Sequence, residues 1–251
     1  MSDMKIHFVI SPAEYAQDFG QACIAKWGQS HLLQASYVVS LGGDGTALVA
    51  KQEVLSAYLL TGKMLPVYNI DCSNSADHVG ALTNHSVSKP DGIRDALMDA
   101  KKIQLYPLQA DCEMLNDDVG GKYRSYYGFN EIAVKVKGYE MTYLDVDFCG
   151  ESVCIKGDGV VIATPLGKRG YYYNLSGMDF SDNQIGIQSI ASRQNVNRIL
   201  SDDEIVQVKV KSKHRLTCVM RDCNLISSPI LSAKIYKSKI SLTVLKDRQR
   251  D

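Results

Sequence analysis

The spacing of the apolar residues changes near residue 103, and this change constrains the fold more than any other feature of the sequence. Before it, short β-branched runs alternate with segments of helical character. After it, most segments alternate apolar with polar residues, as in Leu144 to Phe148, and glycines separate them. Strands that alternate with helices indicate a parallel sheet, whereas successive alternating runs indicate antiparallel β structure. The sequence therefore predicts an α/β domain followed by a mostly-β domain.

The boundaries of these domains follow from the individual segments. Before residue 103 the pattern predicts strands over 6–10, 37–41 and 66–70, and helices from Ser11-Pro12 to about 27, over 47–60 and over 91–101. The strands predicted after residue 103 are 104–115, 130–137, 142–149, 153–163, 205–211, 216–220 and 230–236, with a final strand over 238–245. We expect a Rossmann-like α/β domain with a parallel sheet over 1–102 and a β-rich, sandwich-like domain over 103–236. The C-terminal strand and polar tail over 237–251 could return to the first domain.

The composition excludes several classes of protein. Lys plus Arg and Asp plus Glu both number 28, so the chain lacks the basic excess of a nucleic-acid binder. No uncharged apolar stretch approaches 18 residues, which argues against a membrane span, and the N-terminal segment lacks the form of a signal peptide. The seven cysteines form no CxxC pair and the five histidines no HxxxH pair. We therefore expect free thiols, no metal site built by the protein alone, and a cytoplasmic location.

The segment 41–46 (LGGDGT) carries the most information about function. It follows a predicted strand and opens a predicted helix, so it lies at the carboxyl end of a strand, where ligands bind to open α/β sheets. Glycines let a phosphate chain approach the backbone, and the helix N-terminus offers free N–H groups. Asp44 could there orient Mg²⁺ or accept a proton from a hydroxyl group. A plain strand-to-helix turn is the alternative interpretation, since the motif is neither a P-loop nor a GxGxxG fingerprint.

Two further segments place polar groups beside predicted strands. Asp158 lies between two glycines, and the loop 165–171 (PLGKRGY) that follows carries the adjacent cations Lys168 and Arg169. Asn130-Glu131 offers an amide and a carboxylate that can bind a base edge or ribose hydroxyls. Taken singly each segment is ordinary, because Asp-Gly is a common hairpin turn and cations in a loop can serve solubility alone.

In this order and at this spacing, the segments resemble the NAD kinase family. The matching pieces are LGGDGT at 41–46, FNE at 129–131 and GDGVVIATPLGKRGY at 157–171, where the family reads close to GDG-apolar-TPTGSTAY. About 85 residues separate GGDG from NE, and 27 separate NE from GDG. Weaker similarities are DHVGALT at 77–83, the region 189–193 and the terminal strand 235–245. GGDGT alone is shared with diacylglycerol and sphingosine kinases and, more loosely, with phosphofructokinases, so the NE and GDG…TP segments carry the distinction.

The resemblance implies a reaction: transfer of the γ-phosphate of ATP, accompanied by Mg²⁺, to the adenosine-ribose 2′-hydroxyl of NAD to make NADP. Asp44 would activate that hydroxyl, and Gly45 would line the same site. The loop that would face the phosphate donor comprises Gly42, Gly43, Gly45 and Thr46.

The resemblance also implies how the dinucleotide is held. Asn130 and Glu131 would bind it, Asp158 would contact its nicotinamide-side ribose, and Tyr171 would help to shape the adenine pocket. The family forms homodimers and homotetramers, and its dinucleotide site borrows residues from a neighbouring subunit.

The departures from the family lie at positions that line its nucleotide site. Residues 166–171 read LGKRGY where the family usually reads TGSTAY, so Leu, Lys and Arg replace small hydroxyl residues. Ala81 stands at the aromatic position of the family's LGF, residues 69–71 read NID where GxN is usual, and extra residues fall within 72–78. We expect Lys168 and Arg169 to contact a phosphate of the nucleotide instead.

Two other functions stay open at this point. The chain could be a related hydroxyl or lipid kinase of the same GGDGT superfamily, although the polar residues Asn130, Glu131 and Asp158 argue against an apolar acceptor groove. It could instead be a non-catalytic nucleotide-binding paralogue, although a protein that only binds has no need of a base at Asp44.

Overall fold

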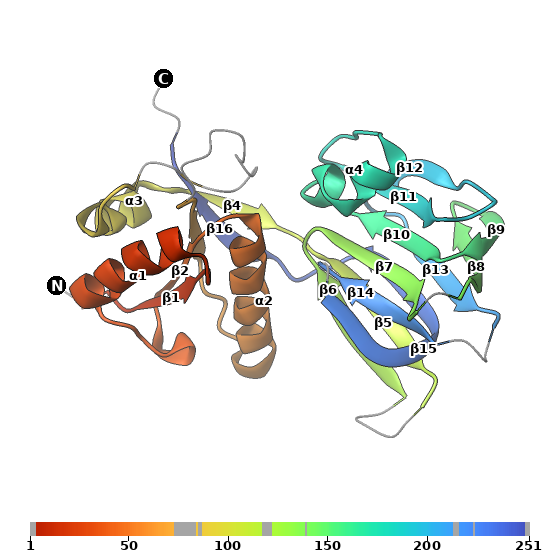
Figure 1. Ribbon diagram of the computed structural model, residues 1–251, viewed down its shortest axis with the longest axis horizontal. Coiled ribbons are helices and arrows are strands. Elements are labelled where there is room, and N and C mark those ends of the chain that lie inside the picture. The colour runs from red at the N-terminus through yellow and green to blue at the C-terminus, as the bar shows by residue number, and fades with distance from the viewer. Residues whose placement is uncertain are drawn as a thin grey trace. The chain divides into compact units, whose positions relative to one another are not determined.

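The computed structural model describes residues 4–72, 84, 87–116, 122–138, 140–212, 216–222 and 224–248. The chain divides into two compact units, one formed by Met1–Leu105 with Ser241–Asp251, and the other by Tyr106–Ile240. The first unit is α/β and the second is almost entirely β (Figure 1). The fold class predicted from the sequence is confirmed.

The sheet of the first unit has the strand order β1-β2-β3-β16-β4. Its strands are β1 (Ile6–Ile10), β2 (Tyr37–Leu41), β3 (Val67–Ile70), β4 (Lys101–Leu105) and β16 (Leu242–Lys246). The pairs β1–β2, β2–β3 and β3–β16 are parallel, and β4 runs antiparallel to β16. The late strand β16 therefore lies inside this sheet, between two strands from the beginning of the chain.

The helices of this unit are α1 (Glu14–Trp27), α2 (Asp44–Thr61) and α3 (Ile93–Asp99), with 3₁₀ turns at Leu32–Gln34 and Pro90–Gly92. Helices α1 and α3 share a core with the sheet through residues such as Cys23, Leu97 and Tyr68. Helix α2 packs on β1, β2 and β3. Strands β2 and β3 are buried on both faces, as expected for parallel strands covered by helices, whereas the edge strand β1 is fully buried only at Ile6 and Phe8.

Two helix boundaries predicted from the sequence are wrong. Helix α1 begins at Glu14 with Ala13 at its N-cap, not at Ser11-Pro12. Ser11 instead donates its backbone N–H to Leu41 O at 2.9 Å, which ties it to the end of β2. The helix predicted over 91–101 ends at Asp99, because Lys101 and the residues after it form β4 by pairing with β16. That pairing partner is more than a hundred residues away in the sequence.

The second unit is an antiparallel sheet of 11 strands in the order β12-β11-β10-β7-β14-β15-β13-β8-β9, with β5 paired to β15 and β6 paired to β5. Its elements are β5 (Leu108–Met114), β6 (Tyr123–Gly128), β7 (Glu131–Val136), β8 (Thr142–Phe148), β9 (Glu151–Gly157), β10 (Gly159–Ala163), α4 (Tyr171–Ser176), β11 (Gln184–Ile190), β12 (Asn197–Ser201), β13 (Val206–Val210), β14 (Thr217–Arg221) and β15 (Asn224–Lys237), with a 3₁₀ turn at Gly167–Arg169.

The long strand β15 lets this sheet fold over its own core. Its first part pairs with β14 and its second part pairs with β13 and β5. One hydrophobic cluster takes side chains from strands on both sides of β15 in the strand order. Val134 of β7 and Ile162 of β10 come from one side, and Leu144 of β8 and Val208 of β13 come from the other. The alternating sequence pattern thus produces the sandwich-like arrangement that it predicts.

Some strands differ from their predicted extents. The run 153–163 is two antiparallel strands, β9 and β10, separated by Asp158. The run 104–115 is likewise two strands, β4 and β5, and each belongs to a different unit. Strands β6, β11 and β12 were not predicted. No helix within the described part of the chain is both long and apolar enough to span a membrane.

Candidate active site

The glycine-rich loop between β2 and α2 is held in place by its first glycine. Gly42 donates its backbone N–H to Ile70 O at 3.0 Å and has a φ of +147°. A Cβ at this position would lie 2.5 Å from Thr46 Oγ1 and 2.7 Å from Ser11 Cβ. Gly42 is therefore required by the fold, and Thr46 packs back on it.

The other two glycines of the loop are not required by the fold. No described atom lies within 4 Å of a Cβ built on Gly43 or Gly45, and neither has a positive φ. Glycine is also a poor helix former, yet Gly45 stands in the first turn of α2. The backbone is bare at positions where this chain leaves room for a side chain, which is the arrangement expected where a ligand approaches the backbone.

Asp44 begins α2 and is exposed. The N-cap residue Gly43 has no side chain to cap the 18-residue helix. The first N–H groups of such a helix carry a positive partial charge and bind anions readily. The loop thus combines an exposed carboxylate, that of Asp44, with uncapped backbone N–H groups that can bind phosphate.

Beside this loop, strand β3 ends in buried polar residues. Ser40 Oγ donates to Asn69 Oδ1 at 2.7 Å. Asn84 extends the sheet, because its N–H donates to Asn69 O, its carbonyl accepts from Asp71 N–H and its side-chain amide donates to Leu245 O. The departure at 69–71 is therefore part of the sheet. The predicted family segment at 77–83, including Ala81, lies outside the described residues.

In the second unit, the turn that carries Asn130 and Glu131 is bound by a residue that the sequence analysis missed. The Asp222 carboxylate accepts three backbone N–H groups, from Phe129 at 2.9 Å, Asn130 at 2.6 Å and Glu131 at 3.3 Å. Asp222 N–H in turn donates to Glu131 O at 3.1 Å. Asp222 follows β14, which pairs with β7, so the sheet brings it to this turn.

The carbonyl groups of the same turn are bound from the other side by Thr164. The Thr164 hydroxyl donates to Phe129 O at 2.6 Å, and its backbone N–H donates to Asn130 O at 2.8 Å. A Cβ on Gly167 would lie 2.0 Å from Asn130 O, so glycine is required there. Glu131 is buried, and position 170 lies beside its carboxylate. The FNE and TPLG segments thus form one packed unit.

The structure does not bring Asp158 to this turn. Strand β10 pairs antiparallel with β7, so that Gly159 lies opposite Lys135 and Ala163 lies opposite Glu131. Asp158 and the 129–131 turn therefore stand at opposite ends of a five-residue strand, about 17 Å apart at the usual rise. Within one chain, Asp158 and Asn130 cannot bind the same ribose.

The glycines on either side of Asp158 are required by the sheet. A Cβ on Gly157 would lie 2.8 Å from Ile190 O, and one on Gly159 would lie 2.2 Å from Val134 O. Gly159 also has a φ of +151°. The Asp158 side chain itself is half-buried, and the backbone of Asp158 bonds to β11 and β7.

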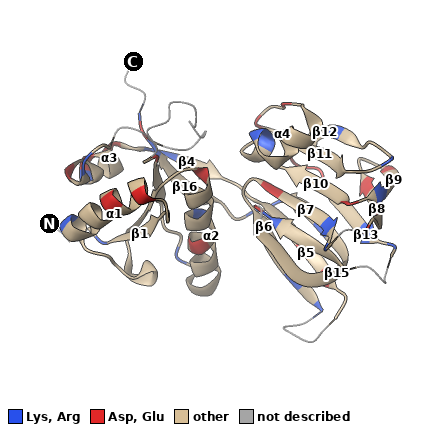
Figure 2. Ribbon diagram, viewed as in Figure 1, with Lys and Arg blue, Asp and Glu red and all other residues tan. Residues whose placement is uncertain are grey.

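The adjacent cations have different environments. Lys168 Nζ donates to Phe180 O at 2.7 Å and pairs with Asp179 at 3.0 Å, and this ammonium holds the pKa of the Asp179 carboxyl below its usual range. Arg169 is exposed, and its guanidinium makes no hydrogen bond within the described part of the chain. Both precede α4, where Figure 2 shows basic residues. Of the pair, Arg169 is the one presented to solvent.

Tyr171 begins α4 and is half-buried against a small cluster on the sheet. Its neighbour Tyr172 fixes this helix: the ring is fully buried, meets Phe180 edge-on at 5.4 Å and covers Gly186. Tyr171 is thereby held at the end of the loop 165–171, near the turn that Thr164 binds.

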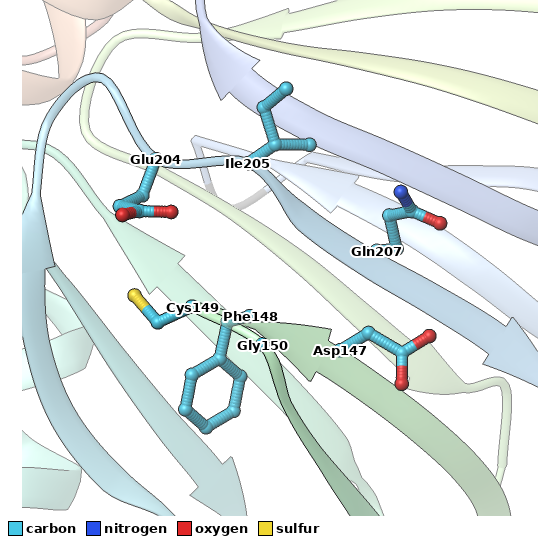
Figure 3. A pocket seen from close by; sticks show the side chains of 7 residues that line it. All are labelled: Asp147, Phe148, Cys149, Gly150, Glu204, Ile205 and Gln207. Carbon is cyan, nitrogen blue, oxygen red and sulfur yellow. The ribbon is translucent and has the colours of Figure 1, made fainter.

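A separate hollow of about 490 Å³ lies at the β8–β9 hairpin (Figure 3). The Cys149 thiol and the Glu204 carboxylate face it, beside Asp147. Partial burial and the neighbouring Glu204 raise the pKa of Cys149. A thiol with a raised pKa is a weak nucleophile, so nothing indicates catalysis at this hollow.

The remaining cysteines and acidic residues point to no further chemistry. The cysteines within the described ranges are free, and burial raises the pKa of both Cys23 and Cys112 to about 12. Nowhere in those ranges do three His, Cys, Asp or Glu residues gather as a metal site would require. Two candidate binding features therefore stand out, the Asp44 loop in the first unit and the Asn130–Glu131 turn in the second.

Comparison with known proteins finds sequence similarity to NAD kinases. Over 175 residues, 69% of this chain, the sequence is 30% identical to an NAD kinase of Xylella fastidiosa, and over 182 residues it is 31% identical to an NAD kinase of Cereibacter sphaeroides. An NAD kinase of Zymomonas mobilis is 25% identical over 213 residues and 77% of its own length. The chain is thus similar in sequence to NAD kinases. No family model matches it.

The chain spans 61% and 64% of the length of the first two NAD kinases. Two solved structures share the fold. The NAD kinase of Archaeoglobus fulgidus in complex with ATP has a TM-score of 0.71 and 18% identity, over 98% of this chain and 95% of its own. The yeast NADH kinase complexed with NADH has a TM-score of 0.66, also with 18% identity, over 85% of this chain and 62% of its own. The two-unit architecture is therefore that of the NAD kinases.

Proposed function

We propose that the protein transfers the γ-phosphate of ATP to the adenosine-ribose 2′-hydroxyl of NAD and so makes NADP. One observation carries the proposal: a bare glycine loop with an exposed carboxylate, and a fixed Asn-Glu turn, occur together in a relative of the NAD kinases. Each feature taken alone would fit several kinases or a simple turn.

Asp44 is the proposed general base. Phosphoryl transfer depends mainly on positioning and on charge stabilisation, with one group that accepts the proton of the attacking hydroxyl. An exposed carboxylate at the end of β2 can reach such a hydroxyl, and the bare backbone of Gly43 and Gly45 can lie against phosphate oxygens.

The donor would be ATP with Mg²⁺. Magnesium is usually bound by one or two carboxylates together with substrate phosphates and water, and needs no cage built by the protein. Such a metal would arrive with the nucleotide, held by its phosphate oxygens and by water, so that Asp44 can act as the base. When bound, the ion would neutralise charge on the phosphate oxygens.

Asn130 and Glu131 would hold the dinucleotide, and Tyr171 would shape the adenine side of the pocket. Asp158 lies about one strand length from them, so a role for it in the same dinucleotide site requires either the far end of the ligand or a second chain. We propose a homodimer or homotetramer in which Asp158 contributes to a neighbour's site.

The test is incubation of the purified protein with Mg-ATP and NAD, followed by detection of NADP. Formation of NADP that depends on ATP supports the proposal. If NADP does not form but NAD raises the melting temperature, the protein is a binding paralogue. If a panel of lipid acceptors is phosphorylated instead, the acceptor assignment is wrong. Sedimentation in the same buffer tests the oligomer.

A further inference from the structure

The turn that carries Asn130 and Glu131 is bound on both sides by side chains from distant parts of the second unit. On one side Asp222 accepts the N–H groups of Phe129, Asn130 and Glu131. On the other side Thr164 donates its hydroxyl to Phe129 O and its N–H to Asn130 O. The N–H and carbonyl groups of Phe129 and Asn130 are thereby all hydrogen-bonded.

Asp222 lies in the tight turn between β14 and β15, where Arg221 pairs with Asn224. Its φ of +46° is in the left-handed region, which residues other than glycine rarely adopt and in which Asp and Asn are the best tolerated. Hydrogen bonds to an ionised carboxylate are shorter and stronger than those between neutral groups, and the Asn130 bond is the shortest of the three at 2.6 Å. Two-residue β-hairpin turns need a positive φ, so the hairpin turn that holds Asp222 in this conformation also carries its carboxylate to residues 129–131.

The pairing of strand β7 does not depend on this contact. Strand β7 is already paired on both sides, with β10 and β14, so the strand that follows the turn needs no further support. The bonds of Asp222 instead fix residues 129–131, which precede and begin that strand.

From this geometry we propose that Asp222 is a positioning residue for the dinucleotide, and that it acts with Thr164 by fixing the Asn130–Glu131 turn. The inference rests on the proposed function. Asp222 would not touch the reacting atoms. It would set where the Asn130 amide and the Glu131 carboxylate stand when NAD binds. Its loss would therefore weaken NAD binding beyond what a control substitution with the same loss of melting temperature causes.

The experiment compares two substitutions with matched controls. Asp222→Asn keeps the size and tolerates the left-handed backbone, but removes the negative charge that attracts three N–H groups. Thr164→Val keeps the shape and removes the hydroxyl, whereas Thr164→Ser keeps the hydroxyl. Asp111→Asn is the control for general destabilisation, because Asp111 also accepts three hydrogen bonds, from Gln109, Ser125 and Tyr236, in the same unit but away from the turn.

We expect Asp222→Asn and Thr164→Val to raise the KM for NAD by about tenfold or more, with a smaller change in kcat. The KM for ATP should stay within about twofold, Thr164→Ser should restore most of the NAD affinity, and Asp111→Asn should lower the melting temperature while its KM stays near that of the wild type. If Asp222→Asn and Asp111→Asn lower stability alike and neither changes the KM for NAD, the positioning role is wrong.

The wild-type protein separates this inference from the proposed function. If the wild type makes NADP but the variants keep its KM, the proposed function stands and the positioning role falls. If the wild type binds NAD without turnover, NAD-dependent stabilisation of wild type and variants decides the positioning role, and the kinase proposal falls. If the wild type does not bind NAD at all, both are overturned.

Discussion

Asp44 and Asp158 each stand between two glycines beside a strand, but the glycines serve different purposes. Around Asp158, a methyl group at 157 or 159 would strike the backbone of a neighbouring strand. Around Asp44, a methyl group at 43 or 45 would meet no described atom. The same three-letter motif is therefore a packing requirement in the second unit, whereas in the first unit no described residue fills the space beside it.

The largest effect should separate the two aspartates themselves. Asp44→Asn should lower kcat by about 10²–10⁴-fold, since a general base contributes on that order. The exposed side chain should allow the fold to survive unchanged. Asp158→Asn should leave kcat within about tenfold and act mainly on the KM for NAD. Steady-state kinetics measure kcat and KM for the two variants, and melting curves check that each is folded. Equal losses of kcat in Asp44→Asn and Asp158→Asn would show that the two aspartates do not differ in role.

The next effect concerns the stability of the second unit. Gly159→Ala forces a side chain into a φ of +151° and against Val134 O. Backbone strain and overpacking should together lower the free energy of unfolding by about 2–5 kcal/mol. Chemical denaturation measures this. An alanine at 159 that is tolerated without loss of stability would show that the sheet does not require glycine there.

The glycines beside Asp44 should behave in the opposite way. Gly45→Ala should leave stability unchanged or raise it by up to about 1 kcal/mol, because alanine favours the helix. Gly43→Ala should also fold normally. Both should weaken nucleotide binding by about tenfold or more, since the methyl group would occupy the space of the ligand. Titration calorimetry with ATP and with NAD tests this, and unchanged affinities would reduce the loop to a plain turn.

The smallest effects should come from the two adjacent cations. Lys168 is bonded to Asp179 and Phe180 within the protein, whereas Arg169 is exposed. Lys168→Met should slightly lower the melting temperature. Arg169→Ala should leave it unchanged but weaken NAD binding by about tenfold, an effect that should shrink as salt rises. Arg169→Ala with wild-type affinity at low and high salt would make this cation a solvated surface charge.

The sequence was sufficient for those features that depend on neighbouring residues. The change of periodicity predicts the two kinds of domain, and the run 41–46 predicts a glycine loop between a strand and a helix, as observed. The features that depend on distant pairing were not predictable. Strand β4 exists because residue 101 meets residue 246, and the role of Asp222 becomes visible only where β14 lies beside β7, about ninety residues away.

The basic pair illustrates the same limit. Lys168 and Arg169 are equivalent in the sequence, and both were predicted to contact phosphate. The difference between them depends on Asp179 and Phe180, which follow the short helix α4 and return to Lys168. No local pattern indicates which of two adjacent cations a later turn will bind.

The position of β16 has a consequence for how the protein is made. Leu242–Lys246 lie between β3 and β4, and the whole of the second unit is encoded between β4 and β16. During synthesis β1, β2 and β3 can assemble early, but β3 keeps an open edge until every residue of the second unit has been translated. An unpaired edge strand readily associates with other chains. The nascent first unit therefore keeps an edge that can misassociate for as long as the second unit is being translated.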